Sequence, residues 1–310
     1  MLSTHSRLNG SSALTLPQSS PLTSSLRQLL LIGTSILSLG SAPVFATPEI
    51  NWSSAGFDEP ESVLPHPTQP LLYVSNINGK PTELNGKGYI SLLADDGSVI
   101  RHAWVMGMNA PKGMAIHNNM LYVADMQELH IIDAEKGELV RTIKSDSSVM
   151  LNDVVVDDNG TVYVSDMLGG GIYRYADDQL TQWISKEALP HPNGLFIEKG
   201  NLIVATWGEG LQDDFSTQVL GGLSSINLQT SAITPYKKAQ TLGNLDGIAI
   251  VNNAIIVNDW INGNVFEYKN KEVKKLFNAG KYASDISSKG NTLYVPMMFS
   301  KKIDAYTMGE

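Results

Sequence analysis

Four polar side chains occupy the same position of a repeated sequence pattern, at the start of an apolar run. They are Glu61, Asn152, Asn193 and Asp246. Two carboxylates and two carboxamides supply only hard oxygen donors, which suit calcium or magnesium rather than zinc or copper. If the four side chains converge, the two carboxylates would repel each other unless something positive lay between them. Lys112, at the same position of another copy, is the alternative source of that charge.

The pattern occurs six times along the chain. Its key residues are separated by 51, 40, 41, 53 and 38 residues, and they are Glu61, Lys112, Asn152, Asn193, Asp246 and Ser284. Each key residue precedes a short apolar run, and a second run begins 9 to 11 residues after it. A period of about 40 residues with several strands per unit is typical of β-propellers. The sequence therefore predicts an all-β fold, a six-bladed β-propeller in residues 47–310, whose key residues meet at the central axis.

The ends of the chain indicate how the ring closes. The copy that begins at Ser284 has room for three strands before the C-terminus. Residues 47–60 are therefore expected to supply the missing fourth strand, because a closed ring leaves no exposed sheet edge.

Residues 1–46 differ from the rest of the chain. They contain no Asp or Glu, and an apolar segment at 29–39 is followed by Val44 and Ala46 in the −3 and −1 positions of a signal-peptide cleavage site. The sequence predicts a secretory signal peptide and an exported protein, periplasmic or secreted. A membrane anchor is disfavoured because the apolar run is shorter than the roughly 20 residues of a span. An organelle transit peptide shares the lack of acid and stays an open alternative.

Composition excludes several kinds of chemistry. The chain has no cysteine, which rules out a thiol nucleophile and thiolate-bound zinc or iron–sulfur sites. The 22 basic residues are scattered and the net charge is −9, so a nucleic acid is not an expected partner. A small molecule, bound by a monomer with no membrane span after signal cleavage, is the expected partner.

Two copies carry extra residues after the second apolar run, at 77–88 and 207–222. The second strand of a blade returns to the face from which the first one leaves. Both insertions are therefore expected to overhang the key residues, unless they are ordinary surface loops. A turn of helix is expected at 181–188.

Three motifs resemble those of a known superfamily. Pro60-Glu61-Ser62, Pro192-Asn193-Gly194-Leu195 and Leu245-Asp246-Gly247-Ile248 are similar to the metal-site motifs of the gluconolactonase, regucalcin and luciferin-regenerating-enzyme superfamily. Diisopropyl fluorophosphatase and the paraoxonases are more distant relatives of that group. The resemblance extends over about residues 55–306. It implies a six-bladed propeller with one divalent cation, usually calcium, in the axial tunnel, and hydrolysis of lactones or related esters.

The resemblance also implies roles for individual residues. Glu61, Asn193 and Asp246 would be metal ligands, and Asn152 would be a ligand or a substrate contact beside the metal. Asp246 would in addition be the general base or nucleophile.

Further residues are expected around a substrate pocket. Lys112 and Met114 would line it, and Ser284 and Asp285 stand where the fluorophosphatase relatives place an axial histidine. His191 is a candidate proton shuttle at the mouth, although a histidine beside proline is more often a turn residue.

One departure from the superfamily bears on the substrate. The region at 147–151 lacks the arginine with which gluconolactonase-like members bind substrate, which argues against a sugar-acid lactone. The sequence thus predicts a calcium-dependent hydrolase of a lactone or related ester. The alternative is a non-catalytic exported propeller, used as a binding or scaffold module with a structural metal ion.

Overall fold

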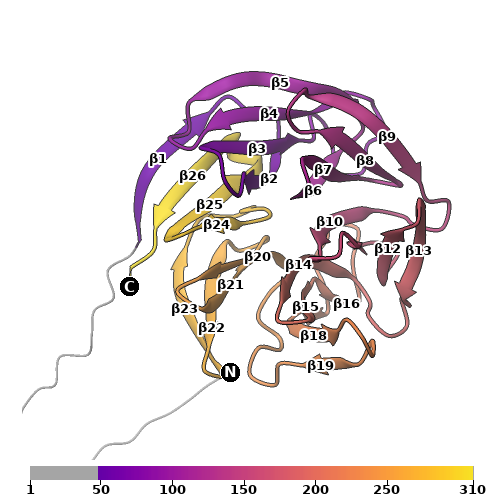
Figure 1. Cartoon of the computed structure of the whole chain (residues 1–310). Coiled ribbons are helices and arrows are strands. Elements are labelled where there is room, and N and C mark those ends of the chain that lie inside the picture. Colours follow the sequence, from indigo (N-terminus) through magenta and orange to yellow (C-terminus); the bar gives the residue numbers. More distant parts are fainter. Residues whose placement is uncertain (1–47, 310) are drawn as a thin grey trace, which may run out of the picture. The chain divides into compact units, whose positions relative to one another are not determined.

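A computed structural model describes residues 48–309, which form six four-stranded antiparallel sheets arranged as blades around a central axis (Figure 1). The predicted all-β, six-bladed propeller is confirmed. The signal-peptide prediction for residues 1–46 lies outside the described residues. Within 48–309, the single helical element is the short 3-10 turn η1 (Met298–Ser300), and no helix is long and apolar enough to cross a bilayer.

The first three blades are each built from four consecutive strands. These are β2 (Pro60–Pro65), β3 (Leu71–Asn76), β4 (Gly88–Ala94) and β5 (Val99–Met108); β6 (Pro111–His117), β7 (Met120–Asp125), β8 (Glu128–Asp133) and β9 (Glu138–Lys144); and β10 (Leu151–Val156), β11 (Val162–Asp166), β12 (Ile172–Ala176) and β13 (Gln179–Ile184). The turn of helix expected at 181–188 is wrong, because its first half belongs to β13, where Val/Ile/Trp-type β propensity and pairing with β12 prevail.

The fourth and fifth blades follow the same plan, with a small two-stranded hairpin inserted in the fourth. Their strands are β14 (Pro192–Glu198), β15 (Asn201–Thr206), β18 (Leu223–Asn227) and β19 (Ile233–Pro235), with β16 (Gly208–Glu209) and β17 (Val219–Leu220) in the hairpin; then β20 (Leu245–Val251), β21 (Ala254–Asp259), β22 (Asn264–Lys269) and β23 (Glu272–Asn278). The hairpin coincides with the insertion at 207–222.

The sixth blade joins the two ends of the described chain. Its strand order is β24 (Ser287–Lys289), β25 (Thr292–Met297), β26 (Lys302–Thr307) and β1 (Glu49–Ala55). Strand β1 pairs antiparallel with β26, and Ser53 Oγ donates a 2.6 Å hydrogen bond to the buried Asp304 carboxylate. The expected closure by an N-terminal strand is confirmed.

The hydrophobic core of residues 48–309 is divided into seven clusters. Six of them lie between neighbouring blades, and the seventh joins residues of several blades near the axis. For example, Val63, Leu72 and Val74 of the first blade pack against Tyr294 and Ile303 of the sixth. These side chains come from one face of each strand and are almost fully buried, as expected for sheets packed face to face. This packing makes the inner strands a rigid frame around the axis.

A β-bulge recurs at the start of the innermost strand of the first five blades. In the fourth blade, Pro192 faces Thr206 while Leu195 faces Val204, so the first strand carries one extra residue between these pairs. The same shift is found between β2 and β3, β6 and β7, β10 and β11, and β20 and β21. In every case the key residue lies inside the bulge. Bulges re-aim side chains, so the repeated bulge explains why the key side chains point toward the axis.

Candidate functional site at the propeller axis

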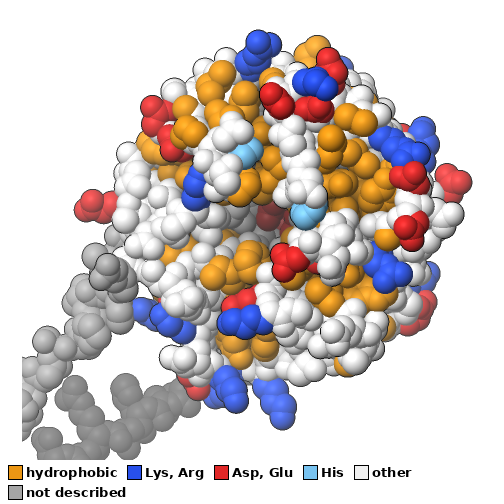
Figure 2. Space-filling model, in the orientation of Figure 1, with side chains coloured by type: hydrophobic (Ala, Val, Ile, Leu, Met, Phe, Trp, Pro, Cys, Tyr) orange, Lys and Arg blue, Asp and Glu red, His pale blue; other side chains and the backbone are white. Residues whose placement is uncertain are grey.

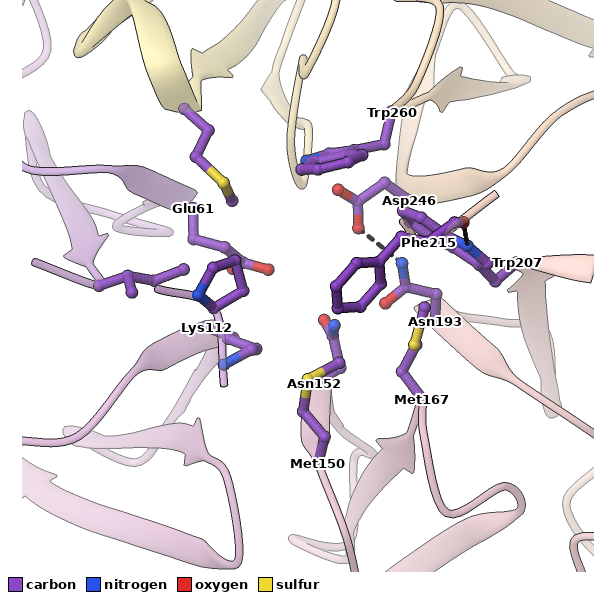
Figure 3. A pocket seen from close by; sticks show the side chains of 13 residues that line it. Glu61, Lys112, Met150, Asn152, Met167, Asn193, Trp207, Phe215, Asp246 and Trp260 are labelled. Carbon is purple, nitrogen blue, oxygen red and sulfur yellow. Dashed lines mark hydrogen bonds between the residues drawn. The ribbon is translucent and has the colours of Figure 1, made fainter. Parts of the chain in front are cut away.

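The key residues of five blades meet in one cavity at the axis (Figure 3). Its base is formed by side chains that we call the polar ring, and these are Glu61, Lys112, Asn152, Asn193 and Asp246. All five are almost completely buried. The structure thus brings together every residue expected to bind the metal. Ser284, the key residue of the sixth blade, is also buried but does not line this cavity, and its Oγ donates to Tyr282 O.

Side chains at the ends of the second strands fix the backbone that carries the polar ring. Asp125 accepts hydrogen bonds from the N–H groups of Asn109 and Ala110, at 2.7 and 2.6 Å, just before Lys112. Asp166 accepts in the same way, at 2.8 Å, from the two N–H groups at 149 and 150 that precede Asn152. Aspartate commonly caps turns in this way. Here each aspartate fixes the loop that positions a ring side chain.

Glycine follows the ring residue where the inner strands approach closely. A Cβ on Gly194 would lie 2.0 Å from Asp246 O, and one on Gly247 would lie 2.1 Å from Ile286 N. Neither glycine has a positive φ. Glycine is therefore required at both positions by the close approach of the backbones and not by a turn conformation. This crowding brings the polar ring together around the axis.

Three oxygen atoms of the polar ring are buried and have no hydrogen-bond partner within residues 48–309. They are Glu61 Oε2, Asn152 Oδ1 and Asn193 Oδ1. Asn193 Nδ2, in contrast, donates to Asp246 Oδ1 at 2.8 Å and to Leu245 O at 3.2 Å, which turns the Asn193 oxygen toward the cavity (Figure 3). Buried polar atoms in native proteins are rarely left unpaired, so these three oxygens call for a ligand.

The charges of the ring are poorly balanced. Burial, followed by the negative charges of Asp246 and Asp285, raises the pKa of Glu61 well above its usual range, and Lys112 opposes the shift. Burial and the Asp285 charge likewise raise the pKa of Asp246, against the Asn193 hydrogen bond and the Lys112 charge. A positive charge at the ring would reverse both shifts.

Lys112 supplies part of that charge without contacting the carboxylates through a hydrogen bond. Its Nζ donates to Ala110 O at 2.7 Å and lies 3.7 Å from Met126 Sδ. Burial lowers the pKa of Lys112, and the charges of Glu61, Asp125 and Asp246 oppose that shift. The ammonium is therefore directed at a backbone carbonyl rather than inserted between the two acids.

A second cavity lies further along the same inner strands, and it contains two of the expected pocket residues. Met114 and Asp285 line this second cavity instead of the first. The physical reason is strand geometry: successive residues of an inner strand advance along the axis. Asp153, which the sequence analysis did not single out, lies there too.

The two acids of the second cavity are also buried. Burial raises the pKa of Asp285 to about 7, against the hydrogen bond from Ser62 Oγ. Burial and the Asp285 charge raise the pKa of Asp153, which accepts hydrogen bonds from Leu195 N and Val154 N. Figure 2 shows one end of the axis as a hollow at the centre of the ring, with hydrophobic side chains around it.

His191 holds a turn that joins two neighbouring blades. It lies at a positive φ of 47°, and its Nδ1 is 2.8 Å from Met167 O, to which it donates. The side chain ties the fourth blade to the third and does not line the axial cavity. This geometry fits the turn residue better than the proton shuttle.

Both insertions reach the axial cavity. Pro81, from the insertion at 77–88, and Phe215, from the insertion at 207–222, contribute to its wall. A further regularity concerns the ends of the second strands, where the sequence draws attention to Trp207 and Trp260 alone. The residue directly after each second strand is apolar, and these six residues, which we call the apolar collar, are Ile77, Met126, Met167, Trp207, Trp260 and Met298. All of them except Met126 line the axial cavity. Counting one position past each second apolar run would have found them.

Another group of possible metal ligands, Asp125, Glu128 and His130, lies in the second blade, with ligand atoms within 4.8 Å of one another. The Asp125 carboxylate already accepts two backbone N–H groups, and His130 Nε2 lies 2.9 Å from it. These hydrogen bonds explain why the side chains lie close together, without a metal ion.

No protein-family model and no curated protein matches this sequence. Several solved structures do match this chain. A catalytically inactive virginiamycin B lyase from Staphylococcus aureus, solved with quinupristin, aligns with a TM-score of 0.56 and 13% identity over 83% of this chain and 99% of that one. A Bacteroides thetaiotaomicron protein of unknown function aligns with a TM-score of 0.61 and 11% identity, over 84% and 73%. The nidogen/laminin complex gives 0.56 and 16%, over 72% and 91%. These neighbours are β-propellers, and at such identities the likeness shows the fold alone.

Proposed function

We propose that this protein is a calcium-dependent hydrolase that acts on a lactone or a related ester at the propeller axis. The observation that carries the proposal is the set of three unpaired, buried oxygens on Glu61, Asn152 and Asn193, beside the Asp246 carboxylate. Their residue order along the chain is the one that resembles the gluconolactonase, regucalcin and luciferin-regenerating-enzyme superfamily. The proposal includes export, which rests on the sequence of residues 1–46.

The ring fits a hard divalent cation. Glu61 Oε2, Asn152 Oδ1, Asn193 Oδ1 and the Asp246 carboxylate would hold it. All of these ligand atoms are oxygens, and no histidine or cysteine among the described residues 48–309 lines the cavity, which favours calcium or magnesium over zinc or copper. The raised pKa values of both acids support the same assignment, because a bound cation would stabilise their ionised forms.

When bound, the cation would polarise the carbonyl of the substrate as a Lewis acid. The chain supplies the rest of the chemistry. Asn193 Nδ2 holds one oxygen of Asp246 and so orients this carboxylate at the cavity. Asp246 then acts as general base: it takes a proton from the attacking water, whose oxygen bonds to the carbonyl carbon. The C–O bond of the lactone or ester breaks, and Asp246 returns the proton to the departing oxygen, which leaves as a hydroxyl group. Direct attack by the Asp246 carboxylate is the alternative route.

The apolar collar and Phe215 surround this reaction centre with apolar groups. Removal of bulk water strengthens the interaction between the ring charges and a developing oxyanion. Exclusion of bulk water also leaves the water beside Asp246 as the nucleophile.

The test is hydrolysis of a lactone and ester panel by protein purified after expression of the full chain, with calcium or with a chelator. Turnover should require calcium, and Asp246→Asn should lower kcat by about 10²–10⁴, the usual contribution of a general base. The matched control is Asp146→Asn at an exposed aspartate outside the cavity, which should leave turnover unchanged. Calcium binding without any turnover would instead favour a non-catalytic binding module with a structural ion.

A further inference from the structure

The wall of the axial cavity is apolar although its base is charged. Among residues 48–309, thirteen line the cavity, and the five polar ones are the polar ring (Figure 3). The other eight are apolar, five of them from the apolar collar. An apolar residue at this position in all six blades points to a wall built for apolar contact.

Several hydrogen-bond donors near this wall already have a protein partner. Trp207 Nε1 donates to Phe215 O at 2.8 Å. At the base, Asn193 Nδ2 and Lys112 Nζ donate to protein oxygens. A ligand hydroxyl group that lies beside the apolar side chains, away from the unpaired oxygens of the polar ring, would therefore lose its hydrogen bonds to water, which is unfavourable.

Phe215 lies across the upper part of the cavity. Its ring stands in the space between Glu61 and Asn193 in Figure 3, in front of the polar ring. It packs edge-on against Trp207, with 6.5 Å between the ring centroids, and the ring centroids of Trp207 and Trp260 lie 5.6 Å apart. Phe215 also has a φ of 65°, which a bulky residue rarely adopts. Such a conformation persists where surrounding contacts impose it, often at functional sites.

From these observations we infer the substrate class. The ester or lactone carries a short apolar substituent beside its carbonyl group, and Phe215 sets the maximum length of that substituent. This inference rests on the proposed function. Each methylene that enters the apolar wall should raise kcat/KM about fourfold until the chain reaches Phe215, and then the gain should stop. A buried hydroxyl should lower kcat/KM by about 5- to 150-fold.

The experiment compares γ-lactones with the same ring and different substituents: methyl, propyl and hexyl, with hydroxymethyl as the polar counterpart. The wild-type protein should prefer propyl to hydroxymethyl and gain little from hexyl. Phe215→Ala should raise the hexyl-to-propyl ratio of kcat/KM by at least about tenfold. The control is Phe299→Ala. The ring centroids of Phe299 and Trp260 lie 6.0 Å apart, but Phe299 is half exposed and does not line the cavity.

Binding of the corresponding alkyl and hydroxymethyl lactams, followed by tryptophan fluorescence, separates this inference from the proposed function. Hydrolysis that favours hydroxymethyl lactones would overturn the inference and leave the hydrolase proposal intact. Tight binding of alkyl lactams with no hydrolysis of any lactone would support the apolar site and overturn the hydrolase. An unchanged length preference in Phe215→Ala would refute the role of Phe215.

Discussion

Glu61→Gln removes one negative charge from the polar ring and keeps the shape of the side chain. In cation-free protein, burial and the charges of Asp246 and Asp285 raise the pKa of Glu61. Folding therefore favours the protonated acid, and stability falls as the pH rises above the ordinary pKa of 4.5. The loss is bounded, because the carboxyl group can take up a proton: at pH 7 it cannot exceed about 3.4 kcal/mol. Glu61→Gln lacks this destabilisation.

Calcium should reverse the order of stability. At a concentration 100 times its Kd, a ligand stabilises the folded state by about 2.7 kcal/mol. For a domain of about 260 residues, an unfolding entropy of roughly 2.1 cal/mol/K per residue converts this into a rise in Tm of about 5 °C. If loss of the Glu61 charge weakens binding about 100-fold, the same calcium concentration gives about 0.4 kcal/mol, or less than about 1 °C.

The assay is thermal unfolding at pH 7, followed by circular dichroism, with chelator and with calcium. Glu61→Gln should be as stable as the wild type or more stable in chelator, and less stable in calcium. Glu198→Gln, at the far end of β14 and exposed, is the control and should show the wild-type calcium shift. Equal calcium shifts in Glu61→Gln and wild type would refute the metal site. Destabilisation of Glu61→Gln in chelator would show that the carboxylate acts as a strand cap.

Three other predictions concern the frame around the ring. Gly247→Ala should destabilise the fold by about 1–3 kcal/mol or more in urea unfolding, because its Cβ would overlap Ile286 N, whereas Gly309→Ala meets nothing and should be neutral. Asp125→Ala should cost about 2–3 kcal/mol. Burial would raise the Asp125 pKa, but hydrogen bonds from His130, Ala110 and Asn109 outweigh it and lower the pKa. This contribution is present above pH 3.8 and lost as the pH falls through the lower folded value, so the difference between Asp125→Ala and wild type should shrink in acid. Deletion of residues 49–55 should expose the edge of β26 and cause aggregation visible by light scattering.

The fold could be predicted because the repeat contains two independent signals, the apolar runs and the position of the key residue. The two apolar runs of each copy became the first and second strands of a blade, and a common register placed Asn152, Asn193 and Asp246 at equivalent positions. The incomplete last copy predicted that β1 would complete the sixth blade. Convergence at the axis then follows from the symmetry of the ring and needs no knowledge of side-chain packing.

The limits of the cavity could not be predicted in the same way. Met114 is two residues beyond Lys112 and Asp285 is one beyond Ser284, yet both line the second cavity, because residues that follow the key position advance along the axis. His191 is turned aside by its positive φ. Phe215 reaches the cavity through the shape of a long loop, which no repeat specifies.

The charge of the whole axis gives the strongest physical reason to expect a cation. Within the part of the chain that the structure describes, four buried carboxyl groups line the two cavities, against the single ammonium of Lys112. The charge of Asp285 raises the pKa of Glu61, of Asp246 and of Asp153, so the acids of both cavities interact. Water or a proton can satisfy one such acid, but protons cannot satisfy the unpaired amide oxygens of Asn152 and Asn193, which only accept. A divalent cation at the polar ring would meet both requirements at once: it would neutralise the acids and coordinate the amide oxygens.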